Sequence, residues 1–256
     1  MTANAPCHPY ISSAGLPWRT APLLDRERSA FDPMAATLLC GRPGPLTLAQ
    51  LSEALDSSLP GVAYTAAFLA GRCSAGDAGG DGALTDRLRA LASSKGNGGD
   101  SPGAPADVAI EAAMALVLRG DPAHGKAALV LRLRAPDPLG DQYKAAFYLA
   151  QLGDPSGYGA LIDTLHSPIP HYRLMAVRHA LAFAPYLGRR VATRRVDITS
   201  LLYERLADDD EMVRSEVPFY LEELAPPDLR GRLGQVELHD PSASVRIAAR
   251  MVFDRN

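Results

Sequence analysis

The chain has 256 residues, of which 47% are hydrophobic, and its formal net charge is −3 at pH 7. A chain of this length and composition can bury a large core, and its small net charge argues against nucleic acid as the default partner. Cys7, Cys40 and Cys73 are odd in number and form no C-x-x-C pair. We therefore expect reduced thiols rather than a disulfide framework or a zinc site.

Residues 1–46 are expected to form an N-terminal extension and a first helix, with Trp18 as an anchor for that arm. Residues 1–17 lack the basic and apolar segments of a secretory signal. The most apolar run, residues 108–118, is interrupted by Glu111 and is too short to span a bilayer. We therefore expect a cytoplasmic protein that makes no membrane contact.

A Gly-Asp-Pro motif occurs twice, at residues 120–122 and 153–155, so its copies are 33 residues apart. Glycine after the end of a helix adopts the left-handed conformation, aspartate caps the next helix, and proline fits its first turn. An alanine pair precedes each copy, at residues 112–113 and 145–146, and such pairs let two helices approach closely. The motif predicts stacked helical hairpins.

The same pattern recurs along the chain, because an aromatic or branched residue opens the second helix of each predicted hairpin. We therefore predict an all-α fold, an α-solenoid of about six HEAT-like helical hairpins over residues 47–256. Insertions interrupt it at the glycine-rich segments near 76–82 and 96–103 and at an arginine-rich loop, 185–197; inserted loops often carry function. The opening residues are Tyr64, Ile110, Tyr143, Tyr172, Val213 and Val245.

Several segments resemble HEAT repeats of the short type first associated with phycobilisome lyases. The resemblance covers residues 47–256 and is most specific over residues 107–163. It implies a curved stack of hairpins, in a family whose members have several functions. The segments are VRIAAR at 245–250, MVRSEV at 212–217, HYRLMAV at 171–177 and AAFYLAQLGDPSGYGALIDTL at 145–165.

Charge separates two neighbouring repeats. Residues 164–196 contain six arginines and no acidic residue, whereas residues 204–223 contain eight acidic residues and two arginines. Opposite polarity on adjacent repeats would orient a partner protein with the inverse pattern. The candidate partner-binding residues are Arg178, Arg189, Arg190, Arg194, Arg195, Asp208, Asp209, Asp210 and Glu211.

Part of this charge has a structural interpretation. Arg173, Arg214 and Arg246 each follow an opening residue, a place where HEAT repeats of this kind commonly carry an arginine that pairs with an aspartate of a neighbouring repeat. The pairs Arg189-Arg190 and Arg194-Arg195 have no such explanation. They form either a solvated loop, a loop neutralised by the acidic repeat, or a site for an acidic surface or a phosphate.

Enzyme classes built on such repeats leave recognisable residues. The metal-dependent hydroxylases carry His-Glu pairs, and this chain has none. The HEAT-like alkylpurine DNA glycosylases use tryptophans in a basic groove, a role that would fall here to tyrosines such as Tyr143, Tyr148 and Tyr172, which we interpret as packing residues. His166, His171 and His179 are spaced too widely for a compact ligand pair on one helix. We expect no metal and no cofactor.

A stack of hairpins offers a long surface that suits a protein better than a metabolite. The main hypothesis is a bacterial, non-enzymatic protein-binding solenoid. It would act as an immunity protein or inhibitor that covers a cognate toxin, or as an adaptor. The alternatives are a HEAT-like DNA glycosylase and a bilin-lyase-like protein.

Overall fold

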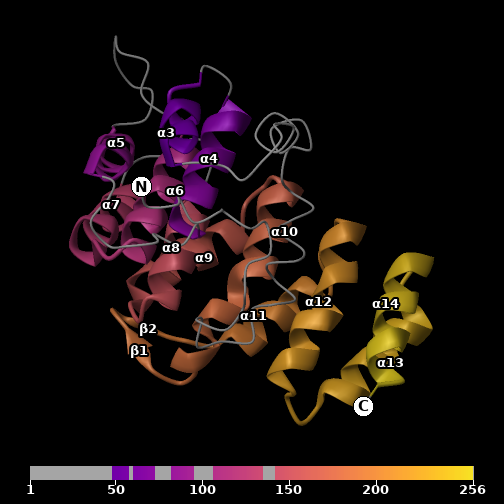
Figure 1. Cartoon of the computed structure of the whole chain (residues 1–256). Coiled ribbons are helices and arrows are strands. Elements are labelled where there is room, and N and C mark those ends of the chain that lie inside the picture. Colours follow the sequence, from indigo (N-terminus) through magenta and orange to yellow (C-terminus); the bar gives the residue numbers. More distant parts are fainter. Residues whose placement is uncertain (1–47, 58–59, 73–81, 95–105, 135–141, 256) are drawn as a thin grey trace. The chain divides into compact units, whose positions relative to one another are not determined.

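The computed structural model describes residues 48–57, 60–72, 82–94, 106–134 and 142–255. Figure 1 draws these residues as a coloured ribbon. They belong to two compact units that divide between Arg132 and Leu133. The predicted extension, residues 1–46, lies outside the described residues, and so do Trp18, the three cysteines and nearly all of both glycine-rich insertions.

The first unit consists of paired helices. Helix α4 packs against α3 and α6, and α5 packs against α6. Ala66 and Ala67 of α4 are fully buried, as an alanine pair at a close helix contact requires. The helices are α3 (Leu48–Leu55), α4 (Pro60–Arg72), α5 (Gly82–Ser93), α6 (Ala106–Leu118) and α7 (Pro122–Arg134).

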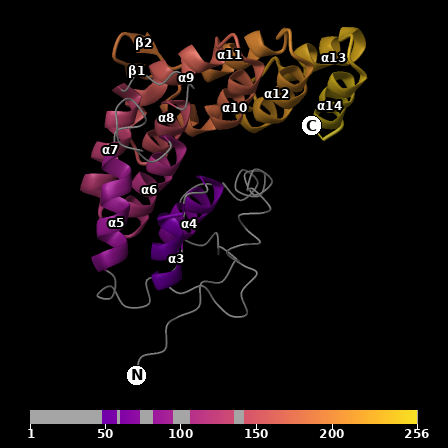
Figure 2. The same ribbon diagram turned by 90° about the horizontal axis from the view of Figure 1, so that it is seen from above.

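The second unit is a row of helical hairpins. Helices α8, α10, α12 and α14 contact one another in succession, and α9, α11 and α13 join them (Figure 2). The helices are α8 (Gln142–Gln151), α9 (Tyr158–Leu165), α10 (Pro170–His179), α11 (Ile198–Arg205), α12 (Glu211–Leu224), α13 (Leu229–His239) and α14 (Ala243–Phe253). The short elements are the 3-10 helices η3 (Pro155–Gly157) and η4 (Ala180–Tyr186) and the strands β1 (Arg190–Val191) and β2 (Arg194–Arg195).

The Gly-Asp-Pro motifs separate helices as predicted. Gly120 and Gly153 have φ of 91° and 86°. The amide of the following aspartate donates to the carbonyl five residues earlier, at 2.9 Å for Asp121 and 2.8 Å for Asp154, which is the hydrogen bond of a Schellman motif. Pro122 begins α7 and Pro155 begins η3. Each motif therefore ends one helix and begins the next.

The two aspartates of the motifs act differently. Asp154 accepts the Ser156 amide at 2.9 Å, as an N-cap does. Asp121 accepts the His124 amide at 3.5 Å and, in addition, bonds the His124 ring at 2.8 Å and the Arg89 Nε at 2.8 Å. The two side-chain bonds, with that to His124 the larger, lower the pKa of Asp121 to about 2.

The prediction of an all-α fold of HEAT-like hairpins is confirmed. The six opening residues fall one in each of α4, α6, α8, α10, α12 and α14. The alanine pairs lie where a second helix comes closest: a Cβ added to Gly157 would lie 2.5 Å from the Ala146 Cα, and one added to Gly125 would lie 2.5 Å from the Ala113 carbonyl oxygen. Small residues on both sides therefore set the helix spacing.

Candidate partner-binding surface

The arginine-rich loop is a β-hairpin inserted between η4 and α11 (Figure 1). Strands β1 and β2 are antiparallel, and the backbone bonds of Gly188 to Val196 and of Val196 to Arg189, both 2.9 Å, extend the pairing. Gly188 and Ala192 have positive φ, of 77° and 52°, so the chain turns sharply at both places. Sequence patterns predicted a loop here, and the strands were missed because each has only two residues.

Two buried tyrosines fix the base of the hairpin. The Tyr186 hydroxyl donates to the carbonyl of Ala150 at 2.8 Å, and the amide of Asp197 donates to the Tyr158 hydroxyl at 2.8 Å. Burial raises the pKa of both tyrosines, so both hydroxyls stay protonated at neutral pH. The base of the hairpin is therefore attached by hydrogen bonds to the repeat formed by α8 and α9.

Arg189, Arg190, Arg194 and Arg195 are all exposed on this hairpin. Within the described ranges, their one ion pair joins the Arg194 Nη1 to Asp163 at 3.7 Å. Arg189 lies over the Tyr186 ring at 5.8 Å. We call these four residues the arginine hairpin. In the part of the chain that the structure describes, none of the four forms an ion pair with an acidic residue of 204–223.

Like charges face each other across the arginine hairpin. Arg190 is paired with Arg195 in the strand register, and Val191 with Arg194. Two cations directly opposite each other on a β-ladder destabilise it. An anion between Arg190 and Arg195 would remove that cost, so this pair is the part of the hairpin best suited to a carboxylate.

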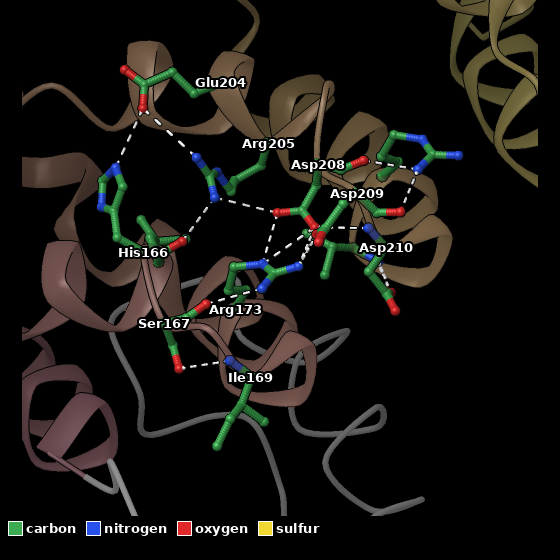
Figure 3. A network of polar contacts seen from close by, with 12 residues as sticks. His166, Ser167, Ile169, Arg173, Glu204, Arg205, Asp208, Asp209 and Asp210 are labelled. Carbon is green, nitrogen blue, oxygen red and sulfur yellow. Dashed lines mark hydrogen bonds and ion pairs between the residues drawn. The ribbon is translucent and has the colours of Figure 1, made fainter.

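The acidic repeat uses much of its charge internally (Figure 3). The Asp208 side chain is 1% exposed and the Arg173 side chain 7%. Arg173 donates to both carboxylate oxygens of Asp208, from Nε at 2.9 Å and from Nη2 at 2.7 Å. Arg205 adds a contact at 3.3 Å, and Asp209 also pairs with Arg173. Asp208 is therefore buried and is not accessible to a partner.

The same pairing recurs one repeat later. Arg214 of α12 donates its Nε to Asp240 at 2.9 Å. We call the pairs Arg173–Asp208 and Arg214–Asp240 rungs, because each joins a helix of the row to the loop before the next. The interpretation that Arg173 and Arg214 pair with an aspartate of a neighbouring repeat is confirmed. Arg246 donates instead to the carbonyls of Asp240 and Pro241.

The other candidate residues divide into internal and exposed ones. Arg178 donates to Glu216 at 2.7 Å, a bond between two adjacent repeats of the row. Asp210 is the N-cap of α12 and accepts the amides of Met212 and Val213. Asp209 and Glu211 are exposed. Of the candidate residues, those exposed are therefore the four of the arginine hairpin and, on the acidic repeat, Asp209 and Glu211.

We predict that Asp208 makes the fold lose stability at low pH. Burial raises the pKa of Asp208, but the hydrogen bonds from Arg173 and from the Asp210 amide lower it by more. The pKa therefore lies below its ordinary value. A depressed pKa contributes stability that is present above the unfolded value of about 4 and is lost as the pH falls below it. Thermal unfolding between pH 3 and 7 should show a steeper acid loss for the wild type than for Asp208→Asn. Parallel curves would contradict this assignment.

The three histidines lie in different surroundings. His166 bonds the Ile162 carbonyl at 2.8 Å, His171 lies against Tyr172, and buried His179 lies against Tyr143 and Phe147. Among the residues with a described position, no group of three metal-ligating side chains is brought together. Tyr143 and Tyr148 are buried, which confirms the packing interpretation for these two.

Hairpins stacked in a row and joined by rungs define an all-α, HEAT-like repeat protein. No helix in the described ranges is long and apolar enough to cross a bilayer. No family model matches the chain, and no curated protein matches it.

The solved structures similar to this chain include three that each match over 81% of it with a TM-score of 0.45. Two are engineered proteins, with 20% and 18% identity over 95% and 97% of their own length. The third is the complex of CpcE and CpcF of phycocyanin lyase from Nostoc sp. PCC7120, with 22% identity over 76% of that chain. Similarity at this level does not assign a function.

Proposed function

We propose that this chain is a non-enzymatic, protein-binding repeat protein and that the arginine hairpin binds an acidic patch on its partner. The observation that carries the proposal is the exposure of four guanidinium groups on a tethered insertion, with one ion pair of 3.7 Å among the described residues. Guanidinium groups bind carboxylates through paired, charge-assisted hydrogen bonds. The tyrosine bonds at the base of the hairpin hold its backbone in place before a partner arrives, which lowers the entropy cost of binding.

A protein fits this surface better than a nucleic acid does. The net charge of the chain is −3, so the arginine hairpin is a local basic feature of a slightly acidic molecule, whereas nucleic-acid binders are commonly basic over a whole face. Asp209 and Glu211 are exposed on the neighbouring repeat. The expected partner therefore carries an acidic patch for the hairpin and basic groups for these two carboxylates.

The more specific form of the proposal concerns inhibition. A binder that covers the functional surface of its partner acts as an immunity protein does on a cognate toxin, and an adaptor would leave that surface open. Coexpression separates the two forms, because an inhibitor suppresses the toxicity or activity of its partner and an adaptor does not.

Removing the four charges should weaken the complex through its rate of formation. With Arg189, Arg190, Arg194 and Arg195 changed to glutamine, we expect the association rate to fall about tenfold or more and its salt dependence to flatten, because charge steers encounter. The partner is first captured by affinity purification from the native host and identified by mass spectrometry. Rates are then measured by surface plasmon resonance at several salt concentrations.

A matched control changes the net charge equally at other places. Arg87, Arg134, Arg230 and Arg255 are exposed arginines outside the hairpin, and their replacement by glutamine should leave association within about twofold of the wild type. Equal loss in both quadruple variants would mean that only net charge matters. Unchanged binding by the hairpin variant would show that the hairpin is a solvated connection. Capture of nucleic acid or a pigment in place of a protein would overturn the proposal in favour of the glycosylase or lyase alternative.

A further inference from the structure

One arginine repeats in the same pose along the row of helices. Its Nη1 donates to the carbonyl oxygen six residues earlier, at 2.9, 2.8 and 2.7 Å in α10, α12 and α14. The loop before each helix therefore presents the guanidinium group in the same way. The three arginines are Arg173, Arg214 and Arg246.

The first two arginines also receive a carboxylate. It comes from Asp208 or Asp240, each in the loop before the next helix of the row. In both loops the carboxylate also accepts an amide two residues later, from Asp210 at 3.0 Å and from Ser242 at 2.8 Å. In both rungs, therefore, the arginine binds an aspartate that lies just before a helix and is fixed by a hydrogen bond within its own turn.

Arg246 makes the carbonyl contacts of the other two arginines but binds no carboxylate in the described part of the chain. Its contacts in the described part of the chain are the carbonyl oxygens of Asp240 and Pro241 at 2.7 and 3.1 Å, both made by Nη1. Its Nε and Nη2, the atoms that hold the carboxylate in both rungs, have no acceptor there. The guanidinium group of half-buried Arg246 is therefore already positioned to bind a carboxylate.

Apolar side chains lie beside Arg246. Ile247 and Met251 are one helical turn apart on α14 and are 59% and 44% exposed. The residue that occupies the place of Ile247 in α10 is Leu174, which is 6% exposed. An apolar helix packed on this face would remove both side chains from water, which is favourable.

We propose that the face of α14 formed by Arg246, Ile247 and Met251 is a docking site for a partner protein. The occupant is a helix preceded by a loop that carries an aspartate, and it sits on α14 as α14 sits on α12. Its aspartate completes a third rung with Arg246, and the apolar face of its helix covers Ile247 and Met251. This site is separate from the arginine hairpin and does not depend on it.

The chain supplies the probe for this site, since residues 225–254 are a repeat with such a loop. Val213 and Val245 are 32 residues apart, so a second copy of residues 225–254 placed directly after Asn256 continues the register. We expect the extended protein to gain helical circular dichroism in proportion to the added helices and to melt at a higher temperature than the parent. An added copy that stays unfolded would overturn the proposal.

The third rung is tested by substitutions in both proteins. Arg246→Ala should lower the melting temperature of the extended protein by several degrees more than that of the parent. Changing the copied Asp240 to alanine should remove this difference, because the two residues then no longer interact. Arg178→Ala, on α10 and away from this face, is the matched control and should shift both proteins equally. Equal shifts for Arg246→Ala as well would overturn the rung.

Methionine oxidation tests whether the face is open in the protein as it stands. Met251 should react rapidly with peroxide in the parent and slowly in the extended protein, whereas buried Met114 should be slow in both. A Met251 already protected in the parent would mean that the chain covers this face itself, and that would overturn the proposal.

Discussion

Replacing Arg173 with alanine should lower the free energy of unfolding by about 3 kcal/mol, because removing one member of a buried ion pair leaves the other charge without compensation. The remaining charge is that of Asp208, whose side chain is 1% exposed. Arg205 stays within 3.3 Å of it, so we expect the lower end of the range for buried pairs. Urea unfolding at pH 7, followed by circular dichroism, measures the loss.

Arg178 provides the matched control on the same helix. Its side chain is 36% exposed and pairs with Glu216, so water screens the interaction. Arg178→Ala should therefore cost less than about 1 kcal/mol. Similar losses for the two variants would show that burial of the rung does not determine its contribution.

A single methyl group at Gly157 should destabilise the second unit by about 1–3 kcal/mol, the usual range for overpacking a close contact. The added Cβ would lie 2.5 Å from both the Cα and the Cβ of Ala146. The φ of Gly157 is −76°, an ordinary value for alanine, so the cost of Gly157→Ala is steric rather than conformational. The expected result is a lower urea midpoint with an unchanged slope.

Gly159, two residues further along, provides a control that separates the steric effect of a methyl group from the effect of replacing glycine by alanine. A Cβ at Gly159 meets nothing within 4 Å, and the residue lies in α9. Alanine there should stabilise by about 0.5–1 kcal/mol, since it has the higher helix propensity. Loss of stability in both variants would contradict the close-packing account of the alanine pair.

The repeat architecture was predictable because its signals are local. Gly120 and Gly153 end helices through a backbone conformation that glycine adopts most easily, and an alanine pair marks each close contact. These features depend on neighbours in sequence, so spacing alone revealed them. The opening residues located the helices of the row for the same reason.

The division of the charged residues was not predictable. Asp208, Asp209 and Asp210 are adjacent and chemically identical, yet one forms a rung, one bridges to Arg173 at the surface and one caps α12. That choice depends on where Arg173 lies, 35 residues earlier in the chain, and no local pattern encodes it. A spacing signal was available in the aspartates five residues before Val213 and Val245, which are the rung partners.

The rungs also bear on how the second unit loses its structure. Each joins only adjacent repeats, so stability is shared between neighbours rather than spread through one common core, as expected for linear arrays. Helix α12 takes part in both rungs, through the loop before it and through Arg214, whereas α14 takes part in one. Opening should therefore begin at α14 and reach α12 later, and amide hydrogens of α12 should exchange among the slowest in the unit. A partner seated on α14 would in this way slow the exchange of helices that it never touches.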